Sequence, residues 1–458
     1  MSDYLNGSIS ETASYKKRFE FSPSQILVFG FATVILLGAV LLSMPFATMD
    51  GHRTYFLNAL FTSTSAVCVT GLVVVDTGTY WSLAGQVIIL LLIQVGGLGF
   101  MTMATFFFLL LGKRIGLKTR LVMQASLNRN HVQGIVNLGR HILIFTFALE
   151  LFFATVLAVR WSFDMGIVKA MWFGLFHSVS AFNNAGFDLF GEFKSLMGYA
   201  ADPVVNLSIT ALIILGGIGF GVVMEVKEAI INKARLHMHT KLVLATTLIL
   251  LLIGTVLIFV FEYNNTLKSL SLSGKLMASF FQSVTPRTAG YNTLDIGALY
   301  GYTQLLIIML MFIGASPGST GGGIKTTTLA VLGASIMSLI RGETSASVFR
   351  RNIPQVQVAK SMAIFILAIL TIVSVSAGLM ISEGGHDFLT ILFETVSAFG
   401  TVGLSMGFTP HLTGAGKLLI IFTMFVGRIG TMTMVLALAE RRKSSANINY
   451  PRGDVMVG

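Results

Sequence analysis

The segment FETVSAFGTVGL (residues 393–404) has three counterparts earlier in the chain: FTSTSAVCVTGL (61–72), FHSVSAFNNAGF (176–187) and FFQSVTPRTAGY (280–291). The next-to-last residue of each copy is a glycine: Gly71, Gly186, Gly290 and Gly403. These glycines recur roughly every 110 residues, which indicates an internal repeat. The stretch before each glycine, such as Tyr55–Val67 or Trp172–Phe182, is too short to cross a membrane as a helix, so we expect a re-entrant helix in each repeat.

Long apolar segments lie on either side of each copy. The 458 residues are 54% hydrophobic and only 11% charged, with a mean hydropathy of +0.80, whereas soluble domains carry about 25% charged residues. About 20 apolar residues cross the ~30 Å hydrocarbon core as a helix. The expected spans are residues 24–46, 83–111, 141–161, 204–224, 242–262, 302–338, 360–382 and 416–439. The chain is therefore predicted to be an integral membrane protein.

The predicted repeating unit is a span, a short pore helix, a glycine loop and a second span. Non-helical backbone at membrane depth is tolerated only inside protein or beside a water-filled cavity, so we expect the four loops to surround one axis. The predicted fold is all-α, with four pseudo-symmetric repeats and eight transmembrane helices around one central pore. We divide the chain into a cytoplasmic N-terminal segment (1–22), repeat 1 (23–112), a cytoplasmic connector (113–140), repeat 2 (141–225), repeat 3 (241–340), repeat 4 (355–440) and a cytoplasmic C-terminal tail (441–458).

Basic residues gather on one side of this topology. Most of the 31 Lys and Arg residues lie in the segments 1–22, 112–140, 225–241, 341–360 and 440–458. Cytoplasmic loops of membrane proteins carry an excess of Lys and Arg, so both termini are predicted to be cytoplasmic in a multi-pass plasma-membrane protein. The same rule explains the net charge of +11 without a nucleic-acid partner. No cleavable signal peptide is expected, because the first apolar stretch is as long as a full span.

The four glycine loops have the features of a cation filter. A dehydrated monovalent cation needs its water shell replaced by oxygens, which a ring of backbone carbonyls can supply. Glycine permits the unusual backbone that turns carbonyls inward, and the carbonyl end of each half-helix favours a cation. One such loop alone would indicate only a tight connection, but four aligned copies favour a potassium-channel-like filter. The residues predicted to form this filter and to bind the cation are Val69, Thr70, Gly71, Asn184, Ala185, Gly186, Thr288, Ala289, Gly290, Thr401, Val402 and Gly403. Bracing from behind is expected from Ser180, Asn183, Asn184, Thr285, Thr288 and Thr401.

The second span of the third repeat is interrupted by GASPGSTGGGIKTTT (residues 314–328). Its glycines and proline will not hold a straight helix in lipid. A nucleotide-binding P-loop is excluded, because that motif needs adjacent Gly and Lys and Ile324 separates Gly323 from Lys325. We expect this irregular segment to line the cavity below the filter, as a movable gate or as a static kink. The predicted gate residues are Gly314, Ala315, Ser316, Pro317, Gly318, Ser319, Thr320, Gly321, Gly322, Gly323, Lys325 and Arg428.

Two charged residues interrupt a repeat within the second spans. The aligned segments are GGLGFMTM (96–103), GGIGFGVV (216–223), GGIKTTTL (322–329) and GRIGTMTM (427–434), so Arg428 and Lys325 each stand where the other copies have glycine. Close helix packing also accounts for the glycines, but not for the charges. An arginine in the middle of a span costs at least ~2.5 kcal/mol, so Arg428 is expected to face the pore axis and to find carbonyl or hydroxyl partners in the 314–328 loop. Glu150, Glu394 and His177 are further candidates for buried polar groups, and structural roles are expected for the last two.

Together, the four loops, their glycines and the interrupted third repeat resemble the Trk/Ktr/HKT superfamily of potassium transporters over residues 22–440. Trk-type members usually carry two additional N-terminal spans, whereas here only a short polar segment precedes the first span. The chain is therefore most similar to the Ktr membrane subunit, which translocates the ion. Plant relatives that favour sodium often have serine in place of the first filter glycine, so Gly71 implies potassium. The resemblance also implies that the 314–328 loop is an intramembrane gate.

The resemblance further implies a homodimer with one pore in each protomer, gated by a separate cytosolic ring of nucleotide-binding RCK domains. The basic segments 113–140 and 341–360 are candidate docking surfaces for that ring, although anionic membrane lipid explains their charge equally well. The tail 448–458 either mediates dimer contacts or is solvated. No cofactor is expected in this chain, because its cytoplasmic segments are short, and nucleotide is expected only on the partner subunit.

The predicted function is potassium uptake across the plasma membrane through a gated pore, with or without a dependence on sodium. An alternating-access secondary cation transporter is the alternative. Such transporters also use broken helices at the membrane midplane, but their repeats are usually two and often inverted. An enzyme is not expected, since no constellation of His, Asp, Glu, Ser or Cys converges at membrane depth.

Overall fold

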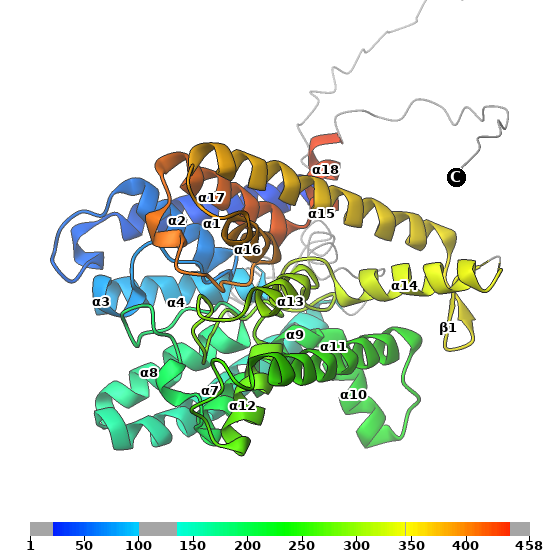
Figure 1. Ribbon diagram of the computed structural model, residues 1–458, viewed down its shortest axis with the longest axis horizontal. Helices are drawn as coiled ribbons and strands as arrows, with labels where there is room; N and C mark the ends of the chain where they lie inside the picture. Colours follow the sequence, from blue (N-terminus) through cyan, green and yellow to red (C-terminus); the bar gives the residue numbers. More distant parts are fainter. Residues whose placement is uncertain (1–21, 100–134, 344, 440–458) are drawn as a thin grey trace, which may run out of the picture.

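The computed structural model describes residues 22–99, 135–343 and 345–439, and these are mainly helical (Figure 1). The predicted N-terminal segment up to residue 21, the connector up to residue 134 and the tail from residue 440 lie outside the described residues, as does the part of the second span between residues 100 and 111. The helices fall into four groups along the chain, one for each predicted repeat.

The first two groups carry short helices just before their glycine loops, where the sequence predicts them. The first consists of α1 (Pro23–Leu42), α2 (Phe56–Val67), the single turn α3 (Thr77–Tyr80) and α4 (Leu83–Leu98). The second consists of α7 (Ile135–Met165), α8 (Ile167–Phe182), α9 (Pro203–Ile218) and α10 (Phe220–Asn232).

The last two groups follow the same order. The third consists of α11 (Met238–Glu262), α12 (Leu272–Val284), α13 (Gly301–Phe312) and α14 (Thr326–Ile340). The fourth consists of α15 (Gln355–Ser382), α16 (Phe388–Gly400), α17 (Gly414–Ile429) and α18 (Thr431–Ala439). A small antiparallel hairpin, β1 (Ser347–Val348) with β2 (Arg351–Asn352), connects these two groups and is an addition to the predicted all-α fold.

The second spans are less regular than predicted. Four helices, α1, α7, α11 and α15, are long and apolar enough to cross a membrane, and the number within the described residues rises to six if each of two bent pairs is one span. The spans expected as single segments at 204–224 and 416–439 are these bent pairs: α9 meets α10 at 99°, and α17 meets α18 at 93°. Each of these two predicted spans is therefore broken into two helices.

Aligned glycines cause these breaks. Gly219 lies between α9 and α10 with a φ of +102°, and Gly430 lies between α17 and α18 with a φ of +89°. An α-helix needs a negative φ at every residue, so it ends where the glycine takes a positive φ, which residues with a Cβ rarely adopt. α4 ends in the same way at Gly99, with a φ of +80°. In the third group the aligned residue is Lys325, which has an ordinary φ of −73° and precedes α14.

Three of the four pore helices are anchored to the long helices by one repeated hydrogen bond. The Ser63 hydroxyl of α2 donates to the Ile35 carbonyl of α1, with the oxygen atoms 2.7 Å apart. The same bond joins Ser178 of α8 to the Glu150 carbonyl of α7 at 2.7 Å, and Ser283 of α12 to α11 at 2.8 Å. A buried hydroxyl without a partner would be costly, so these bonds fix α2, α8 and α12 against the long helices beside them, whereas in α16 the Thr395 hydroxyl donates within its own helix.

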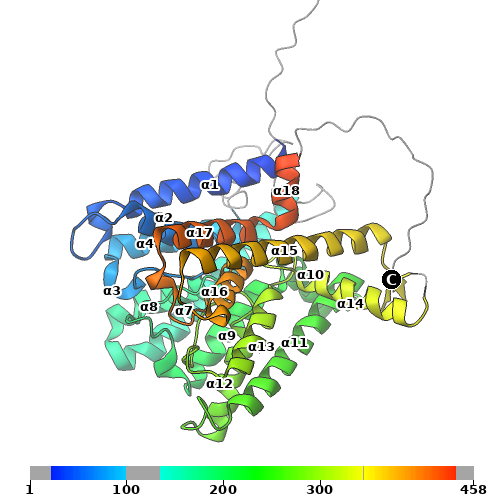
Figure 2. The same ribbon diagram turned by 45° about the horizontal axis from the view of Figure 1, so that its top comes forward.

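The four groups contact one another in a closed cycle, which can be followed in Figures 1 and 2. The helix after each glycine loop packs on the pore helix of the next group: α4 on α8, α9 on α12, α13 on α16, and α17 back on α2. The glycine loops at the ends of the four pore helices are thereby brought together.

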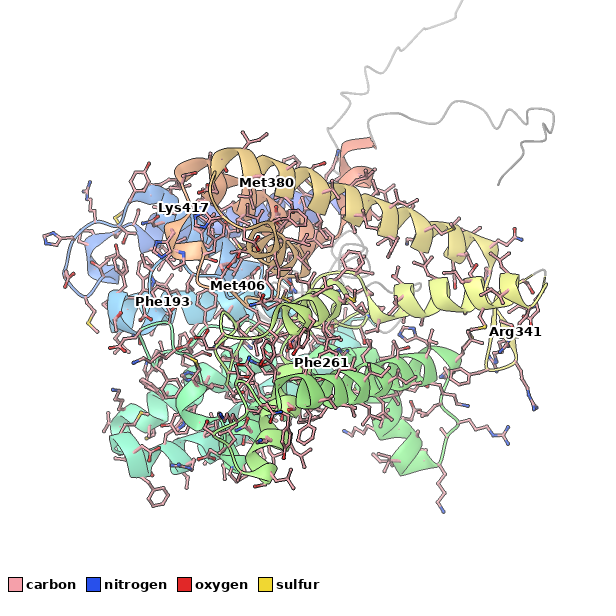
Figure 3. All side chains as sticks on the ribbon, in the orientation of Figure 1. Phe193, Phe261, Arg341, Met380, Met406 and Lys417 are labelled. Atoms are coloured by element: carbon pink, nitrogen blue, oxygen red, sulfur yellow. The ribbon has the colours of Figure 1, made fainter. Side chains whose placement is uncertain are left out.

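The interior holds many buried polar residues beside its apolar core, and the outer surface is apolar. Thr62, Ser63, Thr64 and Ser65 of α2 are buried, as are the corresponding polar residues of the other pore helices. Leu37, Leu151, Leu252 and Val373, one on each long helix, are more than half exposed. A large apolar outer surface is expected where lipid takes the place of water. Figure 3 shows Arg341, beside the hairpin, at one end of the molecule and Phe193 and Lys417 toward the other.

Candidate functional site

The four glycine loops meet in a closed ring. If a Cβ atom were added to Gly71, it would lie 2.6 Å from the carbonyl oxygen of Ala185, and one added to Gly186 would lie 2.7 Å from that of Ala289. The contacts continue in the same order around the ring, from Gly290 to the Val402 carbonyl and from Gly403 to the Thr70 carbonyl. Each glycine therefore lies against a carbonyl of the next loop. No side chain fits at any of the four positions without a shift of this backbone.

The backbone of all four loops departs from the ordinary in the same way. Each ring glycine has a φ between +70° and +95°. The residue two positions earlier also has a positive φ although it is not glycine, and these residues are Val69, Asn184, Thr288 and Thr401. Such residues are uncommon and carry a strain of about 1–3 kcal/mol each. The loops thus share the unusual backbone that a ring of carbonyls around one axis requires.

Hydroxyl groups hold the loops from behind, including two that the sequence analysis did not name. The Ser65 hydroxyl accepts from the Gly71 N–H at 3.0 Å, and the Ser397 hydroxyl accepts from the Gly403 N–H at 3.1 Å. Ser180, which was expected to act as a brace, donates to the Phe187 carbonyl at 2.9 Å. These three serines stand six residues before their glycines, so the repeated pattern itself contained the signal for Ser65 and Ser397.

The third loop replaces this serine. Val284 occupies its position, and the neighbouring Thr285 donates instead to the Tyr291 carbonyl at 2.5 Å. The hydroxyl of Thr288 and the side-chain amide of Asn184 are hydrogen-bonded at 3.1 Å, which ties the second loop to the third. Four of the expected braces, Ser180, Asn184, Thr285 and Thr288, are therefore in contact with loop atoms, whereas the Thr401 hydroxyl has no hydrogen-bond partner within the described residues.

The residues three positions before the ring glycines differ from loop to loop. Cys68 is completely buried and has a free thiol. The Asn183 amide donates to Gln94 of α4 at 2.8 Å and to Glu150 of α7 at 3.1 Å. The other two are Arg287 and Gly400. The environment behind the ring is thus different in every repeat, although the ring itself is regular.

The 314–328 loop lies directly beneath the ring. A Cβ atom added to Gly321 would overlap the Thr288 side chain, and one added to Gly322 would overlap the Thr401 side chain. The loop is closed by a bond from the Gly314 N–H to the Ile324 carbonyl at 2.8 Å.

The same loop is hydrogen-bonded to the break between α9 and α10. The Ser316 and Thr320 N–H groups donate to the carbonyls of Gly217 and Gly216 at 3.0 and 3.2 Å. The N–H of Phe220, the first residue of α10, donates back to the Gly318 carbonyl at 2.9 Å. The bend at Gly219 therefore positions the loop.

Arg428 has the carbonyl partners expected for it. Its guanidinium donates to the Thr320 carbonyl of the loop and to the Gly96 carbonyl at the end of α4, and also to the Gly97 carbonyl at 3.1 Å. Arginine offers five N–H donors in a planar fork, which lets one side chain connect the loop with the first repeat.

Lys325 binds within the loop itself. Its ammonium donates to the Gly321 carbonyl at 2.7 Å and to the Gly322 carbonyl at 3.3 Å. These are the two residues that touch the threonines of the ring. The Arg428 guanidinium and the Lys325 ammonium therefore both hold carbonyls of the segment below the ring.

The remaining candidates from the sequence have structural partners. Glu394 accepts from the Ser405 hydroxyl, from the Met406 N–H at 3.2 Å and from the Thr409 hydroxyl at 2.8 Å, so it fixes the segment after the fourth loop. His177 lies 2.8 Å from the Phe173 carbonyl, and its other ring nitrogen is 3.3 Å from the Leu189 N–H. Within the described ranges, no group of three or more His, Cys, Asp or Glu could hold a metal ion.

A model of a known protein family, described as "TrkH: Cation transport protein", matches residues 21–450. The chain belongs to the TrkH cation transport family. It is therefore a multi-pass membrane transporter and not an enzyme, and the resemblance that the glycine loops indicated is confirmed.

Three relatives show how far this likeness extends. The Ktr system potassium uptake protein B of Bacillus subtilis is 45% identical over 444 residues, which cover 96% of this chain and 98% of that protein. The potassium/sodium uptake protein NtpJ of Enterococcus hirae is 40% identical, with 96% and 98% covered. The crystal structure of the potassium transporter TrkH from Vibrio parahaemolyticus matches with a TM-score of 0.71 at 20% identity, over 92% of this chain and 86% of that one. At this identity the match shows a shared fold.

Proposed function

We propose that this protein takes up potassium across the plasma membrane through a channel-like pore, as the ion-translocating subunit of a Ktr-type system. The closed ring of glycine–carbonyl contacts carries this proposal, because it is the arrangement that replaces the water shell of a monovalent cation. The twelve residues predicted to form the filter are the three last residues of each loop up to its glycine. The potassium transport named for the Bacillus subtilis relative supports the choice of ion.

The architecture that we propose for the pore has eight spans in four repeats around the ring, with both termini in the cytoplasm. The six spans found by length and composition are completed by α4 with the residues that follow it, and by α13 with α14. The cyclic order of helix contacts supports this arrangement, since each repeat meets the next in the same way.

The 314–328 loop is the proposed gate. Its position against Thr288 and Thr401 supports this role, because an ion that leaves the ring would then pass the loop. Its bonds to Arg428 and to the α9–α10 break hold it there. An irregular segment of this kind at membrane depth is tolerated where it lines a cavity.

We further propose that two copies of the chain associate and that a cytosolic nucleotide-binding RCK ring opens the gate. The Ktr naming of the relatives supports a partner subunit. In this arrangement the hairpin β1–β2 and the end of α14 would face the cytosolic RCK ring or anionic lipid. These segments carry Arg341, Arg350 and Arg351.

Uptake of rubidium and sodium tests the proposal. The chain is expressed in cells that lack potassium transport, with and without a cytosolic Ktr partner. Selective rubidium uptake that the Gly71→Ser variant makes less selective is the expected result. The alternating-access alternative predicts instead a fixed ion stoichiometry and an uptake whose selectivity survives that substitution.

A further inference from the structure

The third loop carries a charge that the other three loops lack. Arg287 stands three residues before Gly290, where the other repeats have Cys68, Asn183 and Gly400. Its side chain is buried, with 6% of the residue exposed. Arginine stays protonated in proteins, so the repeat contains one fixed positive charge behind the ring.

This charge has almost no partner within the described residues. The terminal Nη2 donates to the Thr247 hydroxyl of α11 at 3.3 Å, and Nε has no hydrogen-bond partner. None of the salt bridges in the described ranges includes Arg287. Arg428 differs, because three backbone carbonyls face its guanidinium. Carbonyl dipoles offset the charge of Arg428 far more than a single hydroxyl offsets that of Arg287.

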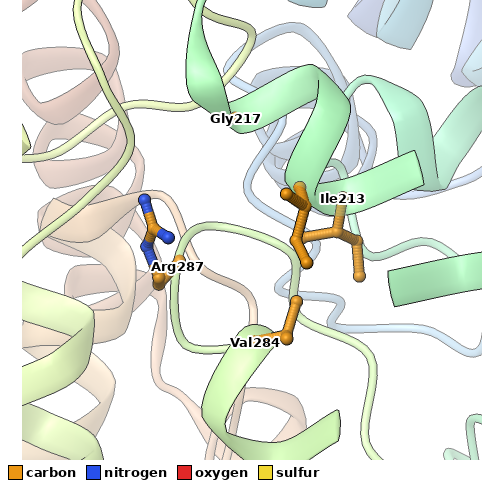
Figure 4. Close-up of a pocket in the computed structure, with 5 residues that line it drawn as sticks. Ile213, Gly217, Val284 and Arg287 are labelled. Atoms are coloured by element: carbon orange, nitrogen blue, oxygen red, sulfur yellow. The ribbon is translucent and has the colours of Figure 1, made fainter. Parts of the chain in front are cut away.

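The surroundings of Arg287 are apolar. Together with Val284 of α12 and with Ile213, Ile214 and Gly217 of α9, it lines a small pocket (Figure 4). The pocket leaves ≈ 10 Å³ for the centre of a water molecule, about the room that one water needs. No acidic side chain in the described ranges forms a salt bridge with the guanidinium, so its field extends into the loop that it supports.

We propose that Arg287 is a specificity-determining residue whose fixed charge weakens cation binding at the ring and discriminates against divalent cations. The inference rests on the proposed potassium pore. Coulomb repulsion is proportional to the charge of the ion, so the free energy imposed on a divalent cation is twice that on a monovalent one. If repulsion by Arg287 weakens the binding of a monovalent cation by some factor, it therefore weakens the binding of a divalent cation by the square of that factor.

Coulomb's law gives the size of the effect. For a separation on the order of 10 Å between the guanidinium and the ion, and an effective dielectric constant near 20, a unit charge changes the binding of a monovalent cation roughly tenfold. The corresponding change for a divalent cation is roughly a hundredfold.

The Arg287→Gln variant tests this relation, with Arg287→Lys as the matched control that keeps the charge. Two quantities are measured in the full-length protein: the potassium concentration that half-saturates uptake and the barium concentration that half-inhibits it. Barium is the probe because its ionic radius is close to that of potassium. We expect Arg287→Gln to lower both, with the barium change close to the square of the potassium change, and Arg287→Lys to resemble the wild type.

A second variant keeps Arg287 and neutralises its charge with a carboxylate placed beside it. Thr247→Asp replaces the hydroxyl partner of Arg287 by a carboxylate of similar size, and it should reproduce the squared relation. The inference is overturned if both neutralising variants stay within twofold of the wild type, if potassium and barium change by the same factor, or if Arg287→Lys behaves like Arg287→Gln. A wild-type protein that takes up no potassium contradicts the proposed function instead, and this outcome is read from the wild type alone.

Discussion

The ring of glycine loops is nearly the same in all four repeats, whereas the segment immediately below it differs between repeats. In the ring, all four repeats use the same backbone, the same glycine and the same contact with the next loop. Below it the four second helices diverge: α4, α9 and α17 end at aligned glycines, whereas α13 ends at Phe312 and is followed by the 314–328 loop, which carries Lys325. One layer is nearly symmetric and the next is not.

This difference corresponds to two physical tasks. Coordinating an ion on the axis requires equal contributions from all sides, so any repeat that departed from the pattern would distort the site. Obstructing the axis requires only one segment, and the other repeats need only to hold it in place. We therefore assign selectivity to the symmetric layer and the control of rate to the asymmetric one, and the predictions below test this division.

The largest effect is expected in the ring. Gly71→Ala and Gly186→Ala place a Cβ against a neighbouring carbonyl and also strain a left-handed backbone by about 1–2 kcal/mol. We expect the preference for potassium over sodium to fall about tenfold or more, since 1.4 kcal/mol corresponds to a factor of ten. Competition between rubidium and sodium uptake measures it.

Gly51→Ala is the matched control for this strain. Gly51 also has a positive φ, of +67°, but no described atom lies within 4 Å of an added Cβ. Its substitution should leave selectivity unchanged. If alanine variants at all four ring glycines discriminate as well as Gly51→Ala does, the ring is not the filter.

The next effect belongs to the layer below. Deletion of residues 316–321 removes the loop segment that touches Thr288 and is bonded to Arg428. Maximal uptake should rise about fivefold, equivalent to roughly 1 kcal/mol, with the preference for potassium nearly unchanged. Initial rates at saturating potassium, corrected for the amount of protein in the membrane, decide this. A static kink that only packs the pore would leave the rate unchanged or lower.

Arg428→Ala should act in the same direction but more weakly, raising maximal uptake about threefold, roughly 0.7 kcal/mol. The substitution removes the link between the Thr320 carbonyl and α4 while the bonds from the loop to Gly216 and Gly217 remain. Combined with the deletion, it should add little, because two groups of one barrier are not additive. Independent, multiplicative effects in the double variant would show that Arg428 acts apart from the loop.

The symmetric layer could be predicted from the sequence and the asymmetric one only in outline. A pattern that recurs four times reports on backbone requirements, so the pore helices, the ring glycines and the interrupted third repeat were visible in the residues. The breaks at Gly219 and Gly430 were not, because Gly216 and Gly217 lie in the same short segment yet remain helical. A glycine can pack a helix against its neighbour or end it, and only the contacts across the molecule decide which. The partners of Asn183 and Arg287 depend on residues 33 to 89 positions away, which no local pattern records.

The smallest expected effect is a difference in uptake rate between alanine variants of Gly219 and Gly430. Gly219 and Gly430 have nearly the same backbone, with φ values of +102° and +89°. A Cβ added to Gly219 would lie 2.6 Å from the Pro317 carbonyl of the loop, whereas one added to Gly430 would have no described atom within 4 Å. Both alanine variants strain the backbone by about 1–2 kcal/mol, so the two should lose similar stability. Only Gly219→Ala also displaces the loop, and we expect it to raise maximal uptake about twofold, roughly 0.4 kcal/mol, while Gly430→Ala keeps the wild-type rate.

Thermal unfolding of the two purified variants checks the shared strain, and initial uptake rates check the difference. Equal rates for the pair would mean that the bend at Gly219 does not position the gate, and that the asymmetry of the lower layer lies in the 314–328 loop and Arg428 alone.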